Sequence, residues 1–150
     1  MPAVLDTHAA VWYLLDSKEL PPTVFGMIDD AAARGTPTYI SAISLVEIVY
    51  LVERGRIAPH AFDVFARELS QSNPAFALAP LDFHVANALR GIPRNLVPDM
   101  PDRIIAATAL HLGLPLVTRG PPPPRCRNPN NLVRFGCIHQ PVALSPAGPV

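Results

Sequence analysis

Four acidic residues stand out in this sequence because each occupies an apolar or turn-like stretch of the chain: Asp6, Glu47, Asp99 and Asp102. Asp6 closes an apolar run near the N-terminus, and Glu47 is flanked on both sides by pairs of aliphatic residues. A buried carboxylate is unfavourable unless it is paired or bound to a metal. Several carboxylates brought together repel one another, and a divalent cation relieves that repulsion. The set therefore predicts a metal site.

The ligand set also indicates which metal and which reaction to expect. Ligands that are all oxygen atoms select hard ions such as Mg²⁺ or Mn²⁺. Such an ion polarises a phosphoryl oxygen, lowers the pKa of a bound water and stabilises the leaving oxygen. Hydrolysis of a phosphodiester bond is the chemistry that fits these requirements.

Each acid also has a purely structural interpretation. Asp6 is suited to cap the N-terminus of a helix, and Asp102 to interact with the macrodipole at the start of another. Glu47 is a candidate buried partner of Arg103, and Asp99 lies in a predicted turn. The functional interpretation therefore rests on the set and its order, and not on any one member.

The elements that position these acids are short strands that alternate with helices. Thr7 is expected to cap the first helix, and Ser41 or Ser44 the third. The alternation predicts an α/β fold whose parallel sheet has helices on both faces. Ligands bind such sheets at the carboxyl ends of the strands, where Asp6 and Glu47 can converge. Strands are predicted at 2–5, 38–40, 76–78 and 114–118, and helices at 8–15, 21–34, 41–52, 59–69, 82–90 and 102–112.

Length and composition fit a single globular domain. The chain has 150 residues, of which 49% are hydrophobic and 16% charged, and its formal net charge is zero. Contact with RNA must therefore depend on a local patch or on metal ions. The sequence has no run of about 18 apolar residues, so no membrane span is predicted. The N-terminus lacks the basic region of a signal peptide, and a cytoplasmic location is therefore expected. Cys126 and Cys137 indicate neither a disulfide framework nor a zinc site.

The character of the chain changes after Arg119, where Gly120 precedes four consecutive prolines. Such a run forms neither a helix nor a central strand. We therefore expect residues 1–119 to be the folded domain. Residues 120–150 are predicted to be an irregular, Pro-rich tail with one short extended piece near 132–135.

Several segments share their order and residue types with a known family. They are Leu5–Ala9 (LDTHA) with Trp12 downstream, Ile40–Ile48 (ISAISLVEI), Pro101–Leu110 (PDRIIAATAL) and Leu114–Thr118 (LPLVT). Over about residues 2–119 the chain resembles a PIN domain of the VapC toxin type. The resemblance implies a three-layer sandwich with a central, mostly parallel sheet of short strands between helices. It also implies RNA cleavage that depends on Mg²⁺ or Mn²⁺, homodimerisation, and neutralisation by a cognate antitoxin.

Carried over position by position, the resemblance assigns the metal and catalytic roles to the acids named above. Asp6 and Asp102 are the implied principal ligands, Glu47 is the second acid of the family's order, and Asp99 assists. The resemblance gives a supporting role, orienting a carboxylate or contacting phosphate, to nearby polar groups: Thr7, Ser44, Arg103 and Thr118. Helix capping is the more ordinary role for the hydroxyl residues at positions 7 and 44.

The chain departs from the family after Thr118, because Gly120 occupies the position of a usual fourth Asp and the tail supplies no obvious last strand. The missing acid favours a second hypothesis, a catalytically weakened PIN fold that only binds its antitoxin. The missing strand would leave a sheet edge exposed. One permitted choice of codons for residues 120–134, read one nucleotide later, spells a sequence close to the usual family ending, so we hypothesise a frameshift, which the coding DNA tests. A phosphatase of the haloacid-dehalogenase kind is discounted, because His8 stands where that group needs a second Asp.

Two predicted helices are unusually apolar for elements near the surface, at residues 12–14 and on the face formed by residues 49, 50 and 52. In relatives, such helices form the dimer and the antitoxin groove, and an ordinary core is the alternative. His8 is expected to pack within its helix, with an approach to the acidic site as the alternative.

Overall fold

Strands and helices alternate along the chain in the predicted order. The computed structural model describes residues 2–72, 74–118 and 135–137. The strands are β1 (Val4–Leu5), β2 (Thr38–Ser41), β3 (Phe76–Ala79), β4 (Leu116–Thr118) and β5 (Phe135–Cys137). The helices are α1 (Thr7–Leu14), α2 (Pro22–Ala33), α3 (Ala42–Glu53), α4 (Ala61–Leu69), α5 (Phe83–Ala88), the 3-10 helix η1 (Leu89–Gly91) and α6 (Met100–Leu112). None of the helices in this part of the chain is long and apolar enough to cross a membrane.

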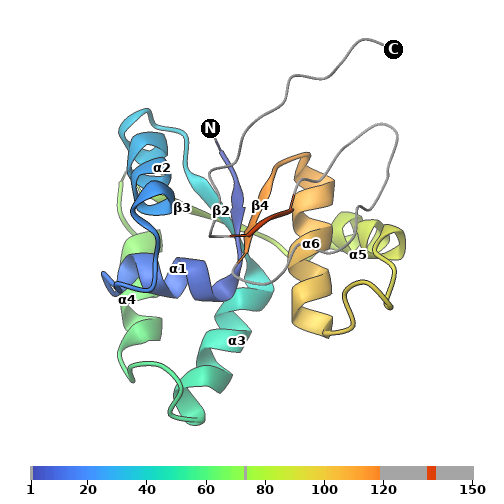
Figure 1. The fold of residues 1–150 in the computed structure, drawn as a ribbon, viewed down its shortest axis with the longest axis horizontal. Coiled ribbons are helices and arrows are strands. Elements are labelled where there is room, and N and C mark those ends of the chain that lie inside the picture. The colour runs from blue at the N-terminus through green and yellow to red at the C-terminus, as the bar shows by residue number, and fades with distance from the viewer. Residues whose placement is uncertain (1, 73, 119–134, 138–150) are drawn as a thin grey trace.

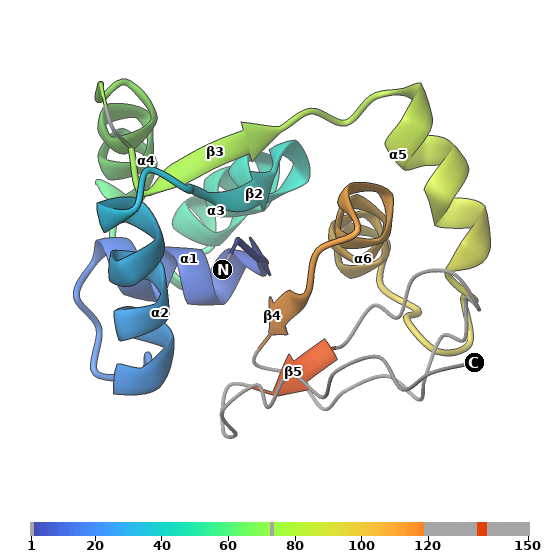
Figure 2. The ribbon, with the colours of Figure 1, turned by 90° about the horizontal axis from the view of Figure 1, so that it is seen from above.

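The strands pair in parallel and form one sheet in the order β3-β2-β1-β4-β5. Leu5 of the central strand β1 pairs with Ile40 of β2 on one side and with Val117 of β4 on the other. Figures 1 and 2 show α1, α2 and α4 on one side of the sheet and α5 and α6 on the other, with α3 continuing from the end of β2. The predicted α/β three-layer sandwich is confirmed.

The central strand β1 is buried on both faces, as expected for a parallel sheet that helices cover on both sides. Its Leu5 belongs to the core that also contains Ile28 and Phe65, whereas Val4 belongs to the core on the α6 side with Ile105. Successive residues of a strand point to opposite faces, so these two neighbours anchor both cores. The residue that follows them is therefore held on a rigid support.

The edge of the sheet beyond β4 differs from the expectation. We predicted no last strand in the tail, only a short extended piece near 132–135, but β5 pairs in parallel with β4, with Leu116 opposite Phe135 and Thr118 opposite Cys137. The expected extended piece overlaps β5 at its first residue. The expected absence of a last strand was wrong because three residues without proline are enough to add a strand, although prolines precede them in the sequence. The β4 edge is therefore paired. The rest of the predicted tail, 119–134 and 138–150, lies outside the described residues.

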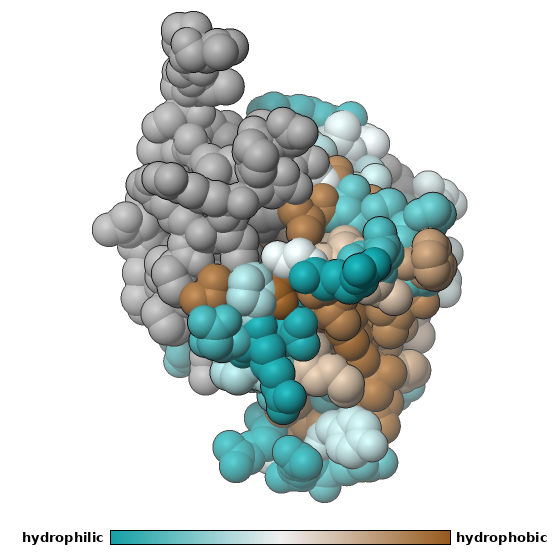
Figure 3. Space-filling view, turned by 90° about the vertical axis from the view of Figure 1, so that its right-hand side faces the viewer, coloured by the Kyte–Doolittle hydropathy of each residue, from teal (hydrophilic) through white to brown (hydrophobic). Residues whose placement is uncertain are grey.

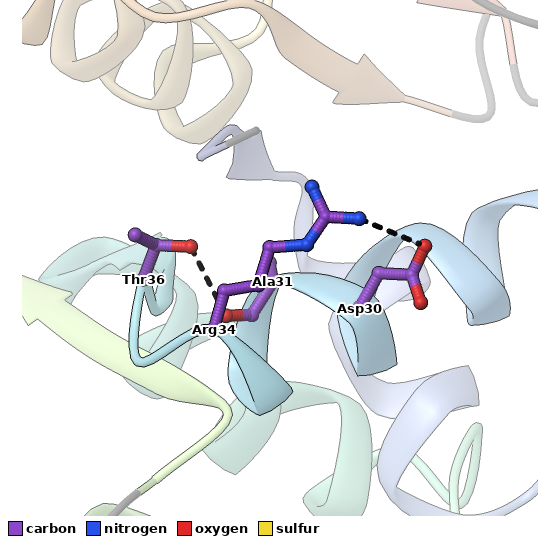
Figure 4. A network of polar contacts seen from close by, with 4 residues as sticks. All are labelled: Asp30, Ala31, Arg34 and Thr36. Atoms are coloured by element: carbon purple, nitrogen blue, oxygen red, sulfur yellow. Dashed lines mark hydrogen bonds and ion pairs between the residues drawn. The ribbon is translucent and has the colours of Figure 1, made fainter.

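The end of α2 shows how the chain turns into β2. Gly35 follows the helix with φ +68°, in the left-handed region that favours glycine. Figure 4 shows two contacts around it: the Thr36 hydroxyl donates to the Ala31 carbonyl at 3.0 Å, and Arg34 forms an ion pair with Asp30 at 3.7 Å. Both partners of the ion pair are exposed, so it adds little to the free energy of unfolding.

Two glycines of this region give a matched test of the fold, because alanine at each should change stability in opposite directions. Gly26 lies within α2, and a Cβ there meets nothing within 4 Å, so Gly26→Ala should raise the free energy of unfolding by about 0.5–1 kcal/mol. A Cβ at Gly35 also meets nothing within 4 Å, but its positive φ should make Gly35→Ala lower the free energy by about 1–2 kcal/mol. Urea unfolding of both variants measures the difference. A shift of the same sign in both would contradict the helix boundary described here.

Candidate active site

The sheet brings the predicted acids to one rim. Asp6 directly follows β1, and Glu47 lies in α3, the helix that follows β2. Asp99 and Asp102 lie at the start of α6, which begins two residues earlier than predicted, at Met100. Figure 1 shows that α1, α3 and α6 begin on the side of the sheet where β1 and β2 end, and α3 contacts both α1 and α6. The predicted convergence is thus realised at the level of the elements.

Electrostatic coupling connects the four carboxylates. Burial raises the pKa of Glu47, and the negative charges of Asp102, Asp99 and Asp6 raise it further. Loss of hydration also raises the pKa of Asp102, with contributions from Asp99 and Asp6. Glu47 and Asp102 therefore resist ionisation, because they lose hydration and lie close to groups of like charge. A cation placed among them would remove this repulsion.

Asp6 has both a structural contact and a position at the rim. Its side chain is 8% exposed, and its Oδ1 accepts a hydrogen bond from the Ala9 amide at 2.7 Å, which caps α1. The cap that we predicted at Thr7 is therefore one residue earlier, and Thr7 is the first residue of the helix. Capping fixes the direction of the Asp6 carboxylate without neutralising its charge.

Two buried hydroxyls orient Glu47. The Thr7 hydroxyl is hydrogen-bonded to the Glu47 carboxylate and lies 2.9 Å from the Ser44 hydroxyl. A threonine hydroxyl has one hydrogen and a carboxylate only accepts, so Thr7 donates to Glu47 and Ser44 donates to Thr7. The capping role that we considered more ordinary for Thr7 and Ser44 is wrong. Ser41 occupies the N-cap position of α3 and makes no side-chain cap.

Arg103 does not hold an acid. Its guanidinium donates to the Ile92 carbonyl at 2.8 Å and to the Leu89 carbonyl at 3.4 Å. The suggested pairing with Glu47 is therefore not found, and Arg103 instead fastens the segment around η1 to α6. The last of the predicted supporting groups, Thr118, ends β4 at the same rim and is half-buried.

The apolar surroundings of Glu47 are less buried than their sequence suggests. Val46 is 48% exposed and Val49 40%, whereas Ile48 is fully buried, so only part of the aliphatic run around Glu47 lies in the core. Tyr50 of the same helix is also exposed. Figure 3 shows that apolar residues cover a continuous area of the molecular face it depicts.

The apolar stretch at 12–14 packs differently from the exposed face of α3. Trp12, Tyr13 and Leu14 are partly buried against the core on the α1 side. His8 is also partly buried, with its ring 6.1 Å from that of Trp12, and its charge lowers the pKa of Asp102. His8 thus packs within its helix, as expected, and its charge also reaches Asp102.

A hydrogen bond that we did not anticipate links the two helices that carry the acids. The Thr108 hydroxyl of α6 lies 3.0 Å from the Ser41 hydroxyl at the start of α3, and it donates to the Ile104 carbonyl at 2.8 Å. Both side chains are fully buried. Two small hydroxyl residues within aliphatic segments were the sequence signal, but nothing local indicated that they meet.

The donor set fits a hard divalent ion in its chemistry, since all four candidate ligands are carboxylates. Within the part of the chain that the structure describes, no group of three or more His, Cys, Asp or Glu side chains is arranged to hold a metal ion. Asp99 and Asp102 are exposed residues, so their side chains have room to change rotamer. Ligation of one ion therefore requires these two carboxylates to turn towards Asp6.

Because like charges repel within the acidic site, ionised Glu47 should lower the Tm of the protein when no metal is bound. Folding raises the pKa of Glu47, so the ionised side chain lowers the stability of the folded state. Below the pKa of the unfolded chain Glu47 is protonated in both states and has no such effect. The loss of stability grows as the pH rises from that value and is complete once the pH exceeds the pKa of the folded state. We expect Glu47→Gln, which keeps an acceptor for Thr7, to raise the Tm in EDTA at pH 7 and to change it little at pH 4. Glu53→Gln, at an exposed position of the same helix, is the control. A lower Tm for Glu47→Gln at pH 7 would contradict the coupling.

Comparison with known proteins identifies the family to which this arrangement belongs. The PIN domain matches residues 3–121. The fold is similar to a chain in the structure of VapBC2 from Rickettsia felis bound to a DNA fragment from their promoter, at 18% identity and a TM-score of 0.60, covering 80% of this chain and 88% of that one. It is also similar to FitAcB from Neisseria gonorrhoeae, at 27% identity and a TM-score of 0.51, covering 79% and 87%. A search of curated proteins found no match. With the family match covering most of the chain and the acids at the rim of the expected sheet, the protein belongs to the PIN domain family.

Proposed function

We propose that this protein is a metal-dependent endoribonuclease and the toxin component of a toxin–antitoxin module. The observation that carries the proposal is the electrostatic coupling of four carboxylates at one rim of a PIN fold. Similarity to VapBC2 and FitAcB supports the toxin part of the proposal. The reaction is hydrolysis of an RNA phosphodiester bond.

The residues at the rim have different roles in such a site: some hold the metal ion and others orient its ligands. Asp6 and Asp102 hold Mg²⁺ or Mn²⁺, with Glu47 and Asp99 assisting. When bound, the ion supplies a Lewis acid for the phosphoryl oxygen and an activated water. Thr7 fixes one oxygen of Glu47, so the carboxylate is oriented before substrate arrives. The hydrogen-bonded cap fixes Asp6 in the same way.

The proposed protein partners are a cognate antitoxin and a second copy of the chain. An exposed apolar face is what such partners require, and α3 offers one at Val46, Val49 and Tyr50. The protein's zero formal net charge gives no general attraction for RNA, so the metal site and nearby arginines must supply it.

A cleavage assay tests the proposal. The purified full chain should cut a structured RNA when Mg²⁺ or Mn²⁺ is added and stop when EDTA is added. Activity that is unaffected by EDTA would belong to another mechanism or a contaminant. Asp63→Asn, on the exposed surface of α4, serves as a matched acidic control and should cleave like the unmodified chain.

A second candidate is a weakened PIN fold that binds its antitoxin without cleaving RNA, which Gly120 favours because the family usually has an Asp there. The two candidates differ in the response to Gly120→Asp. If the missing acid limits the site, this variant should bind Mg²⁺ more tightly by calorimetry and gain cleavage activity. If the unmodified chain already cleaves RNA at a rate that Gly120→Asp does not change, the weakened-fold candidate is excluded.

A further inference from the structure

Two histidines from different helices stack on the surface that α5 and α6 form together. The rings of His84 in α5 and His111 in α6 have centroids 5.6 Å apart and planes only 7° from parallel. Both residues are exposed, so their nitrogen atoms are accessible to solvent ions. Phe83 contacts the His84 ring edge-on at 5.9 Å, which limits the space that this ring explores.

The separation of these rings suits a shared ion. Two imidazoles that bind one tetrahedral ion at about 2.1 Å hold their ring centroids roughly 5 Å apart. Side-chain rotation at two exposed positions is enough to aim one nitrogen from each ring at the same point. Imidazole pairs select Zn²⁺, Ni²⁺ and Cu²⁺ and bind Mg²⁺ poorly, because Mg²⁺ prefers oxygen ligands.

A carboxylate strengthens the case for a cation here. Asp82 caps α5 through a hydrogen bond from the Val85 amide at 3.0 Å, which holds its carboxylate at the start of the helix that carries His84. A metal ion at His84, two residues further along the chain, would be attracted by this negative charge. Since no group of three or more metal-ligating side chains is arranged for binding within the described ranges, water would have to complete the coordination of such an ion.

The two helices that carry these histidines, α5 and α6, pack closely against each other. Val85 of α5 is buried in the core that α6 also lines. Arg103 of α6 donates to the Leu89 and Ile92 carbonyls that follow α5, and a Cβ at Gly91 would lie 3.4 Å from Leu110. The segment is thus packed tightly on α6. Figures 1 and 2 show α5 beside α6 in both views.

We propose that His84 and His111 form a binding site for a transition-metal ion of the Ni²⁺ and Zn²⁺ class, separate from the acidic site. His111 lies in the last turn of α6 and Asp102 in its first, about 13 Å apart along the helix axis. One ion therefore cannot bridge both sites. The bound ion clamps α5 to the helix that carries Asp99 and Asp102, and the proposal holds whether or not the chain cleaves RNA.

Calorimetry with Ni²⁺ on the full chain tests the site. We expect one binding event that His84→Gln and His111→Gln each remove, and that His60→Gln, at an exposed histidine elsewhere, leaves in place. Asp102→Asn should also keep it, which separates this site from the carboxylates. Binding that persists in both His84→Gln and His111→Gln, or that disappears in Asp102→Asn, would overturn the proposal.

A thermal measurement provides a second and independent readout. Ni²⁺ at a hundredfold excess over its Kd should raise the Tm of the unmodified chain by about 5–10 °C, because it binds only the folded state. The Tm of His84→Gln without metal should match that of the unmodified chain and should not respond to Ni²⁺. An equal response in both proteins would show that the ion binds elsewhere.

Discussion

Replacing Asp102 by Asn should reduce metal-dependent RNA cleavage by about a hundredfold or more, because a metal ligand contributes several kcal/mol of transition-state stabilisation. Asparagine has the same shape as aspartate and lacks its charge. The variant therefore weakens the attraction of the rim for a divalent ion without leaving a cavity. Asp102 is exposed in the first turn of α6, so the fold does not depend on its packing.

The same substitution should stabilise the protein when no metal is present. The pKa of Asp102 is raised by loss of hydration and by Asp99 and Asp6, which shows that its ionised form is unfavourable in the folded state. Removing that charge should raise the Tm in EDTA at pH 7. Activity and stability thus move in opposite directions, which distinguishes a lost ligand from a damaged fold.

Cleavage rate and Tm are measured on the same preparation, with Asp63→Asn as the control for the loss of one exposed acid. The control should retain both the rate and the Tm. An Asp102→Asn protein that cleaves as fast as the unmodified chain would remove Asp102 from the site. One that is inactive but less stable in EDTA would assign it a structural role instead.

The placement of Asp6 and Glu47 at the same rim was predictable because it follows from the pairing of two strands. A strand that ends at residue 5 and another that precedes Glu47 become neighbours in any sheet that pairs β1 with β2 in parallel. Their carboxyl ends then meet, whatever the detailed packing. The alternation of short apolar strands with helices, which set that topology, was visible in the sequence.

The partners of individual side chains were not predictable in the same way. Thr7 sits where a helix cap is expected, but its hydroxyl bonds to Glu47, which is 40 residues away in the sequence. Capping is a local rule, and it competes with contacts that only the folded chain creates. The predicted pairing of Arg103 with Glu47 was wrong for the same reason, because its guanidinium instead donates to the carbonyls of Leu89 and Ile92.

The burial of the residues around Glu47 was a third property that the sequence alone did not determine. The aliphatic run around Glu47 left both a core face and a partner-binding face open, and in the structure Ile48 is buried whereas Val46 and Val49 are exposed. Apolar residues on one face of a helix can serve the core or a partner, and the sequence pattern is the same in both cases. An extended piece was expected near 132–135, but its pairing as the strand β5 was not, because that pairing depends on β4 and not on any periodicity of its own.

Replacing Thr7 by Val should weaken Mg²⁺ binding and RNA cleavage by about 10- to 100-fold, the usual loss when a group that orients a metal ligand is removed. Valine matches the volume of threonine but offers no hydrogen to Glu47. The Thr7 hydrogen bond is the largest factor that lowers the pKa of Glu47, so its loss should raise that pKa further. A carboxyl that keeps its proton binds a cation poorly, and the loss of affinity should therefore be larger at pH 6 than at pH 8.

Calorimetry with Mg²⁺ at both pH values, on Thr7→Val and on Thr7→Ser, separates orientation from packing. Serine keeps the hydroxyl and should restore most of the affinity, although it lacks the buried methyl group. Thr36→Val, which removes a hydroxyl hydrogen bond at the end of α2, should bind Mg²⁺ like the unmodified chain. If Thr7→Val and Thr7→Ser lose affinity equally, with no dependence on pH, the hydroxyl does not orient Glu47. The acidic rim would then owe its geometry to the backbone of α1 and α3 alone.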